Sequence, residues 1–281
     1  MTTKNVWNYV HIDPSLVERN RFVHPTTPPL PPPLPPGGSS GLQGSYILMP
    51  STSTYALGVD ALRDACTKET GCPHPDFTLS NGSKIYRPLT FKENIEARVK
   101  DYETTKHPDG QTKTEEERLA LFARWLDSCT GIAYQAKTTK FRVIPICSPL
   151  ITIDKANNDP FLDLPYTSFL QGVELDSSSR TVKYNAGLSQ MEVPNHPGWR
   201  AAVDDDASLL RTYAAIVFPK LKTKFNIDTG MGFYVRQNTD TDELRALCVN
   251  DLDNDSYAGG SNILNYDGSF LRVAPSSSQK K

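Results

Sequence analysis

Two clusters of aspartates in this sequence have a spacing that could bind a metal ion or supply a general base. The first is the run Asp204–Asp206, at the start of a long apolar-periodic segment. Consecutive residues point their carboxylates in different directions and converge poorly on one ion, whereas Asp is among the residues preferred just before the first turn of a helix. We therefore interpret this run as the start of a helix rather than as a metal site.

The second cluster contains Asp251, Asp253 and Asp255, whose alternation resembles the start of a calcium-binding loop. A full loop of that kind requires Gly at its sixth position and Glu at its twelfth. The sequence has Ser256 and Asn262 at these positions. A solvated acidic loop is therefore the favoured interpretation. Calcium binding by these three residues remains the one metal alternative.

Histidine and cysteine offer two weaker candidates for chemistry. His196 lies in the segment Asn-His-Pro-Gly-Trp and could act as a base or metal ligand, but a histidine before proline in a turn is the simpler interpretation. Cys66, Cys72 and His74 do not have the spacing of a zinc site, and no second Cys/His pair follows them. Neither group predicts a reaction.

We assign no catalytic residue, cofactor or metal ligand from these patterns, and the chain is expected not to be an enzyme. A phosphate-binding P-loop and the glycine motif of dinucleotide-binding folds are both missing. One enzymatic alternative stays open, a metal-dependent hydrolase whose site would draw on five residues: His196, Asp204, Asp251, Asp253 and Asp255.

The elements around these residues predict an α+β body that contains β-hairpins and several amphipathic helices. Capping boxes, in which a Thr is followed three residues later by Glu, begin at Thr90 and Thr114. Apolar residues at helical spacing follow each box, so we expect a helical hairpin over residues 90–102 and 114–129. A further helix is expected over residues 54–65, and the longest is expected from Asp204 to about Phe225, with a kink or break at Pro219.

Turn residues between apolar runs predict three hairpins. Asn81-Gly82 separates residues 77–79 from 84–87, and Asp267-Gly268 separates 263–266 from 270–273. A polar turn at 176–179 separates residues 169–175 from 180–185. Residues 141–147 and 150–153 are also expected to be extended.

The N-terminal region differs in composition from the rest of the chain. Eight of the 22 prolines fall between Pro25 and Pro36, and Gly and Ser follow them. Proline lacks the amide hydrogen and has a fixed φ, so this segment predicts an extended polyproline rod with a flexible joint. Before the rod lies a short stretch that includes Trp7, Tyr9, Val10 and Ile12, too apolar for a solvated tail. We predict an arm over residues 1–43, a single α+β body over 44–275 with a possible subdivision near 138, and a polar tail over 276–281.

Composition excludes some classes of function. The 281 residues carry a net charge of -2, which argues against sequence-specific nucleic-acid binding through a basic surface. No apolar run is long enough to cross a membrane, and the first twenty residues do not resemble a secretory signal. Five cysteines are a poor disulfide framework and fit a reducing compartment.

Together these features favour a structural component of a large protein assembly. The best fit is a virion protein, for instance of a phage capsid, neck, tail or baseplate, located in a virion or a cytoplasmic assembly. Its partners would be other subunits, in a homo- or hetero-oligomer, bound through six arm residues: Trp7, Tyr9, Val10, Ile12, Leu30 and Leu34. A cytoplasmic adaptor that recruits a partner module through the polyproline segment is the other alternative.

Overall fold

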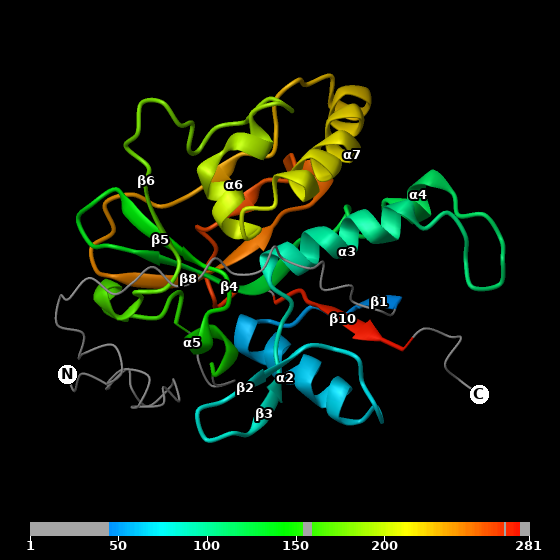
Figure 1. The fold of residues 1–281 in the computed structure, drawn as a ribbon, viewed down its shortest axis with the longest axis horizontal. Helices are drawn as coiled ribbons and strands as arrows, with labels where there is room; N and C mark the ends of the chain where they lie inside the picture. The colour runs from blue at the N-terminus through cyan, green and yellow to red at the C-terminus, as the bar shows by residue number, and fades with distance from the viewer. Residues whose placement is uncertain (1–44, 154–158, 267, 276–281) are drawn as a thin grey trace, which may run out of the picture.

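The computed structural model describes residues 45–153, 159–266 and 268–275, and it confirms a mixed α+β chain (Figure 1). Its helices are α2 (Tyr55–Thr67), α3 (Phe91–Glu103), α4 (Glu115–Arg118), α5 (Ser148–Ile151), α6 (Pro197–Ala202) and α7 (Ala207–Phe225). Its strands are β1 (Ser45–Leu48), β2 (Asp76–Thr78), β3 (Lys84–Tyr86), β4 (Leu126–Tyr134), β5 (Lys140–Ile144), β6 (Val173–Asp176), β7 (Phe233–Tyr234), β8 (Glu243–Val249), β9 (Ala258–Gly259) and β10 (Leu271–Ala274). The proline-rich arm and the polar tail lie outside the described residues.

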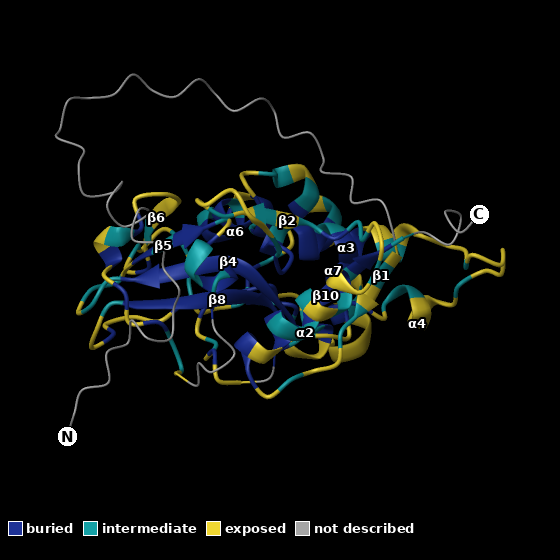
Figure 2. Cartoon of the chain, turned by 90° about the horizontal axis from the view of Figure 1, so that it is seen from below, coloured by how far each residue is buried: buried dark blue, intermediate teal, exposed yellow. Residues whose placement is uncertain are grey.

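A six-stranded sheet with the order β6-β5-β4-β8-β9-β7 forms the centre of the molecule. Every residue of β4 and of β8 is buried, and Figure 2 shows both strands in the colour of buried residues. Side chains alternate between two cores, because successive residues of a strand point to opposite faces. Ile132 and Tyr134 of β4 pack into the core that contains α3, α6 and α7, whereas Ala133 packs into the core that contains α2 and α5.

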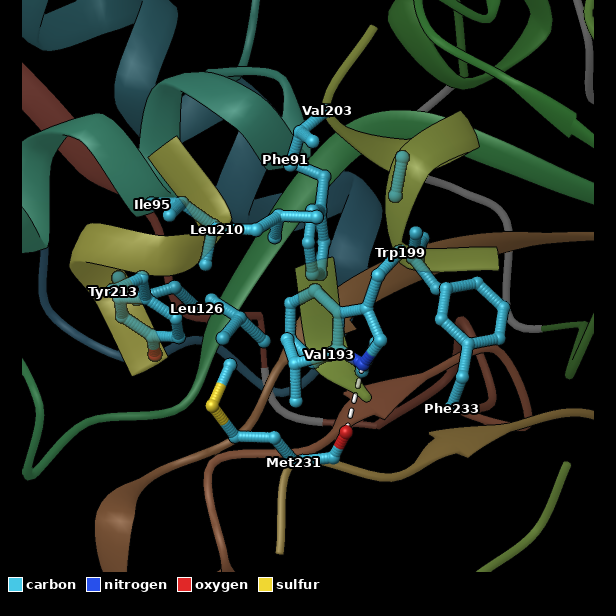
Figure 3. Close-up of a cluster of buried hydrophobic side chains, with 14 of the residues drawn as sticks. Phe91, Ile95, Leu126, Val193, Trp199, Val203, Leu210, Tyr213, Met231 and Phe233 are labelled. Carbon is cyan, nitrogen blue, oxygen red and sulfur yellow. Dashed lines mark hydrogen bonds between the residues drawn. The ribbon is translucent and has the colours of Figure 1, made fainter. Parts of the chain in front are cut away.

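Trp199 of α6 lies in the larger core (Figure 3). It is fully buried, its ring meets Phe91 of α3 edge-on at a centroid distance of 5.4 Å, and its indole Nε1–H donates to the carbonyl of Met231 at 2.7 Å. A buried indole needs such an acceptor, since an unpaired N–H is costly. Trp199 thus joins α3, α6 and the segment before β7.

Several predicted local structures are confirmed, among them a hairpin and a helix start. β2 and β3 form an antiparallel hairpin around Asn81 and Gly82, and Gly82 has the positive φ of +82° that such a turn favours. Asp206 caps α7 by accepting from the amide of Leu209 at 2.9 Å. The helix continues through Pro219 to Phe225, so a break at this proline is wrong, whereas a kink there stays a prediction.

The predicted helix over residues 114–129 is wrong for most of its length. The Thr114 capping box is present, but α4 ends at Arg118, and β4 begins at Leu126. β4 pairs with β5 on one side and with β8 on the other, so its backbone groups are used in two ladders. This long-range pairing outweighs the helical spacing of the apolar residues before it.

Three further strand predictions are also corrected. Residues 148–151 form α5, which has Pro149 in its first turn, where proline's missing amide hydrogen costs nothing. β6 pairs with β5 rather than with residues 180–185. β10 pairs with β1 rather than with residues 263–266, and Asp267 of that expected turn lies outside the described residues. In the last two cases the partner strand is far away in the sequence.

Candidate functional site

β6 occupies one end of the six-stranded sheet and pairs only with β5 among the strands that the structure describes. Its register with β5 places Val173 opposite Val143 and Asp176 opposite Lys140. Gly172, just before the strand, has a φ of +96°, and a Cβ there would lie 2.1 Å from the carbonyl oxygen of Val143. Only glycine allows the chain to approach β5 this closely, so Gly172 determines where β6 begins.

Three exposed apolar side chains lie at this end of the β5–β6 pair, and we call them the β6 rim. Leu170 is 56% exposed, Val173 is 46% exposed and Ile146, shortly after β5, is 41% exposed. Val173 pairs with the last part of β5, so Leu170 before β6 and Ile146 after β5 belong to the same end of the pair. Covering each of these side chains with a partner would contribute roughly 1 kcal/mol.

The face of β6 that carries Glu174 and Asp176 is polar. Arg142 of β5 donates to the carboxylate of Glu174 at 2.8 Å, and the Tyr166 hydroxyl donates to the same carboxylate at 3.0 Å. The hydrogen bond from Arg142 lowers the pKa of Glu174. The Arg142 guanidinium also lies 5.5 Å from the centre of the Tyr166 ring. This face therefore combines a cation held over an aromatic ring with a carboxylate that stays ionised.

Asp176 ends the strand with a fixed carboxylate. Its Oδ1 accepts from the Thr139 hydroxyl at 2.6 Å and from the Ser178 amide at 2.8 Å, and the bond from Thr139 lowers its pKa. Both acidic side chains of β6 are thus negatively charged at neutral pH. The edge of the sheet presents an apolar rim at one end of β6 and an acidic group at the other.

His196 has a structural role at the start of α6. It precedes α6, where its Nδ1 accepts from the Trp199 amide at 3.4 Å and its Nε2–H donates to the carbonyl of Lys183 at 3.0 Å. Burial lowers its pKa to about 4, so the ring is neutral at physiological pH. His74 is similar, because burial lowers its pKa to about 4 and its two nitrogens bond to the backbone of Arg87 and Val273.

The aspartates near residue 253 have separate roles in the described structure. Asp251 caps a short 3-10 helix by accepting from the Asn254 amide at 2.9 Å, and Asp253 forms an ion pair with Lys224 of α7. The backbone carbonyl of Asp255 accepts from the Met231 amide at 2.8 Å. Within residues 45–153, 159–266 and 268–275, no group of three His, Cys, Asp or Glu side chains could hold a metal ion.

Asp204 lies in a different local structure from Asp251, Asp253 and Asp255. It has a positive φ of +52° at the turn before α7, and burial raises the pKa of its carboxyl group. The charge of Lys92 in α3 lowers this pKa, and that of Glu93 raises it. The five residues of the hydrolase alternative therefore serve three different local structures.

The residues of the β6 rim and its polar face were not singled out by the sequence. Val-Glu-Leu-Asp over residues 173–176 alternates apolar and acidic residues, which is the signal of a half-exposed strand.

A second set of residues that the sequence did not reveal surrounds Arg98 of α3. Its fully buried guanidinium donates to the Tyr213 hydroxyl at 2.6 Å and to the carbonyl of Asn250 at 2.9 Å, which joins α3 to α7 and to the end of β8.

No family model matches the sequence, and no curated protein matches it. A solved structure described as "Accommodation of massive sequence variation in Nanoarchaeota by the C-type lectin fold" aligns with 83% of this chain and 99% of its own, at 14% identity and a TM-score of 0.49. A likeness of this strength says nothing about what the present chain binds. No helix in the described part of the chain has both the length and the apolar character needed to span a bilayer.

Proposed function

We propose that this chain is a structural subunit of a large protein assembly, in the manner of a virion protein of a phage capsid, neck, tail or baseplate. Residues 44–275 would form one α+β body, and the arm over residues 1–43 would bind neighbouring subunits. The tail over 276–281 would remain polar and outside the core.

The observation that carries this proposal is the β6 rim beside an edge strand. An edge strand has unpaired N–H and C=O groups, and natural proteins usually protect such edges because another chain can pair with them. Here Leu170 and Val173 add exposed apolar surface at the same place. An exposed apolar patch beside an open edge favours a protein partner.

The arm has the reach that this role needs. Twelve residues of polyproline at about 3.1 Å per residue give a rod of roughly 37 Å. A body of about 230 residues has a radius of gyration of roughly 17 Å, so the rod is about twice this radius. A subunit can therefore place the first residues of its arm on a neighbour.

Ordering the arm on a neighbour costs conformational entropy, about 1–2 kcal/mol for each residue that becomes fixed. The proline rod loses less, because proline is already restricted. The remaining cost must be offset by apolar side chains buried on the neighbour. Trp7, Tyr9, Val10 and Ile12 are suited to this, and Leu30 and Leu34 can add contacts from the rod.

Deletion of residues 1–41 tests this proposal directly. We expect the full chain to form oligomers whose mass rises with concentration in light scattering, and the deleted chain to remain monomeric. The circular dichroism spectrum and melting temperature of the body should be the same in both, because the deletion ends before β1. A full chain that stays monomeric at all concentrations, or a deletion that assembles equally well, would contradict the proposal.

A further inference from the structure

We propose that residues Val6–Ile12 of one copy bind as an additional strand along the free edge of β6 in a second copy. This inference rests on the proposed function, and it names the surface and the segment that would make the contact. β-Strand addition of this kind gains main-chain hydrogen bonds from the open edge and specificity from alternate side chains.

Among the sheet ends that the structure describes, β6 has the most exposed large apolar side chains beside it. At the other end of the same sheet, Phe233 of β7 is fully buried. In the β1–β10 sheet, Leu271 and Val273 of β10 are buried as well, and β1 has only Ile47 as an exposed large apolar side chain; the β2–β3 hairpin has none. β6, in contrast, has three exposed residues among four and lies beside the β6 rim.

The segment Val6–Ile12 has the composition of a strand. It reads Val-Trp-Asn-Tyr-Val-His-Ile, in which five of seven residues are β-branched or aromatic. It contains no proline or glycine, whereas the segment from Pro25 to Gly38 is rich in both. At about 3.3 Å per residue, seven residues span more than the four of β6, so the whole edge can be paired.

A second copy is the expected source of this segment. The described chain begins at Ser45 of β1, and Figures 1 and 2 both place β1 and β6 on opposite sides of the molecule. The flexible joint lets the rod change direction, but a stiff rod does not bend around the body that carries it. The arm would therefore meet the β6 edge of a neighbour, and a chain of such contacts would build an assembly.

The side chains of the added strand would alternate between two faces, as the side chains of β6 do. Side chains of Val6, Val10 and Ile12 would share one face, since they are separated by even numbers of residues. That face would adjoin Val173 and the partly buried Leu175, which packs against the main core.

The opposite face of the added strand would hold aromatic groups. Trp7, Tyr9 and His11 alternate with the apolar set, and they would adjoin the polar face of β6. Arg142 already lies over the ring of Tyr166 there and could interact with a second ring, since cations favour aromatic faces. His11 would lie on the same face as the carboxylates of Glu174 and Asp176, which favour its protonated form.

A cross-linking experiment between two different chains identifies the surface. Both chains carry Cys72→Ser, because Cys72 is the native cysteine that is not buried. One full-length chain also carries Val10→Cys and the other Val173→Cys, and the two are mixed and treated with a short bifunctional maleimide. We expect a cross-link between the two chains, because cross-strand neighbours lie within about 5 Å. Replacing Val173→Cys by Met191→Cys provides the control, since Met191 is an apolar residue with 82% exposure that is not part of the β6 rim.

Surface variants give an independent measurement of the same contact. Leu170→Asp and Val173→Asp should each weaken self-association of the full chain by about tenfold or more, whereas Met191→Asp should change it less than about twofold. Leu170 lies outside the strand, so its variant tests the surface even if Val173→Asp disturbs β6. Circular dichroism of each variant checks that the body is folded.

The outcomes separate this inference from the proposed function. If deletion of residues 1–41 abolishes assembly while both rim variants assemble normally, the arm binds elsewhere and the β6 site is wrong. A cross-link that forms only when both cysteines are in one chain would show that the arm occupies its own body, and would overturn the second-copy assignment. If the full chain does not self-associate at all, both proposals fail.

Discussion

Asp127 is a carboxyl group in the interior of the sheet. It lies on β4, where it is 5% exposed, and its Oδ2 accepts from the backbone amide of Ser269 at 3.0 Å. Burial raises its pKa to about 7. The bond to Ser269 holds the segment that leads into β10, so this residue links the centre of the sheet to the C-terminal strand.

Asp127→Asn tests the effect of this burial on stability. The folded-state pKa is raised above the ordinary value near 4, so the unfolded chain releases its proton more easily. The protonated carboxyl group therefore contributes to the free energy of unfolding at low pH, and this contribution is lost as pH rises from about 4 through about 7. The total loss is up to about 4 kcal/mol. We expect the variant to lose this dependence, because Asn does not ionise and its Oδ1 can still accept from Ser269.

Urea unfolding between pH 5 and pH 8 measures the difference between the two proteins. His74 and His196, whose pKa values are lowered to about 4, act in the opposite direction, since their neutral forms favour folding as pH rises. Both are present in the wild type and in the variant, so their contribution cancels in the difference. Parallel pH profiles for the two proteins would show that Asp127 does not titrate in this range.

At the scale of the secondary-structure element, the starts of α3 and α4 can be compared directly. The two capping boxes have the same residues but different surroundings. Thr90 is buried at the start of α3, and its partner Glu93 also accepts from the buried guanidinium of Arg87 at 2.7 Å. Thr114 is exposed and begins a single turn. The same local motif is therefore part of the core in one case and of the surface in the other.

Thr90→Ala and Thr114→Ala form a matched pair for measuring this difference. Loss of a cap typically costs about 1 kcal/mol, and a buried cap costs more because the freed amide of Glu93 has no water to replace its partner. We expect Thr90→Ala to lower the free energy of unfolding by about 2 kcal/mol and Thr114→Ala by less than about 0.5 kcal/mol. Equal losses in urea unfolding would mean that local capping alone determines the contribution.

At the scale of the whole molecule, the last described strand closes the fold. β10 pairs with β1, the first described strand, and its Val273 amide donates to Nδ1 of His74 at 3.1 Å. Arg272 also forms an ion pair with Glu69 after α2. Segments that are more than 190 residues apart in the sequence therefore meet at β10.

Two C-terminal truncations distinguish this strand from the tail that follows it. Removing residues 276–281 should change the free energy of unfolding by less than about 0.5 kcal/mol, since no described contact is lost. Removing residues 270–281 takes away Phe270, Leu271 and Val273, which are all buried. At roughly 1.5–3 kcal/mol for each side chain, this loss is comparable to the whole stability of a domain, so we expect no cooperative thermal transition.

The sequence by itself determined the structures that depend on neighbouring residues. The Thr90 and Thr114 caps, the Asn81-Gly82 turn and the start of α7 were all predictable, because the groups that satisfy one another lie within three or four residues. The interpretation of Asp204–Asp206 as a helix start agrees with the cap formed by Asp206. The mixed α+β class followed from these local signals as well.

Only the tertiary structure decided the strand partners and the nature of the exposed surface. Leu126–Tyr134 became a central strand and β6 paired with β5 because long-range backbone pairing, which no local pattern records, outweighed helix spacing and turn signals. Leu170 and Val173 are apolar residues that a sequence places in a core, and their exposure depends on β6 lying at the end of the sheet. Burial is a property of the assembled fold, so the candidate surface could be recognised only after the sheet order was known.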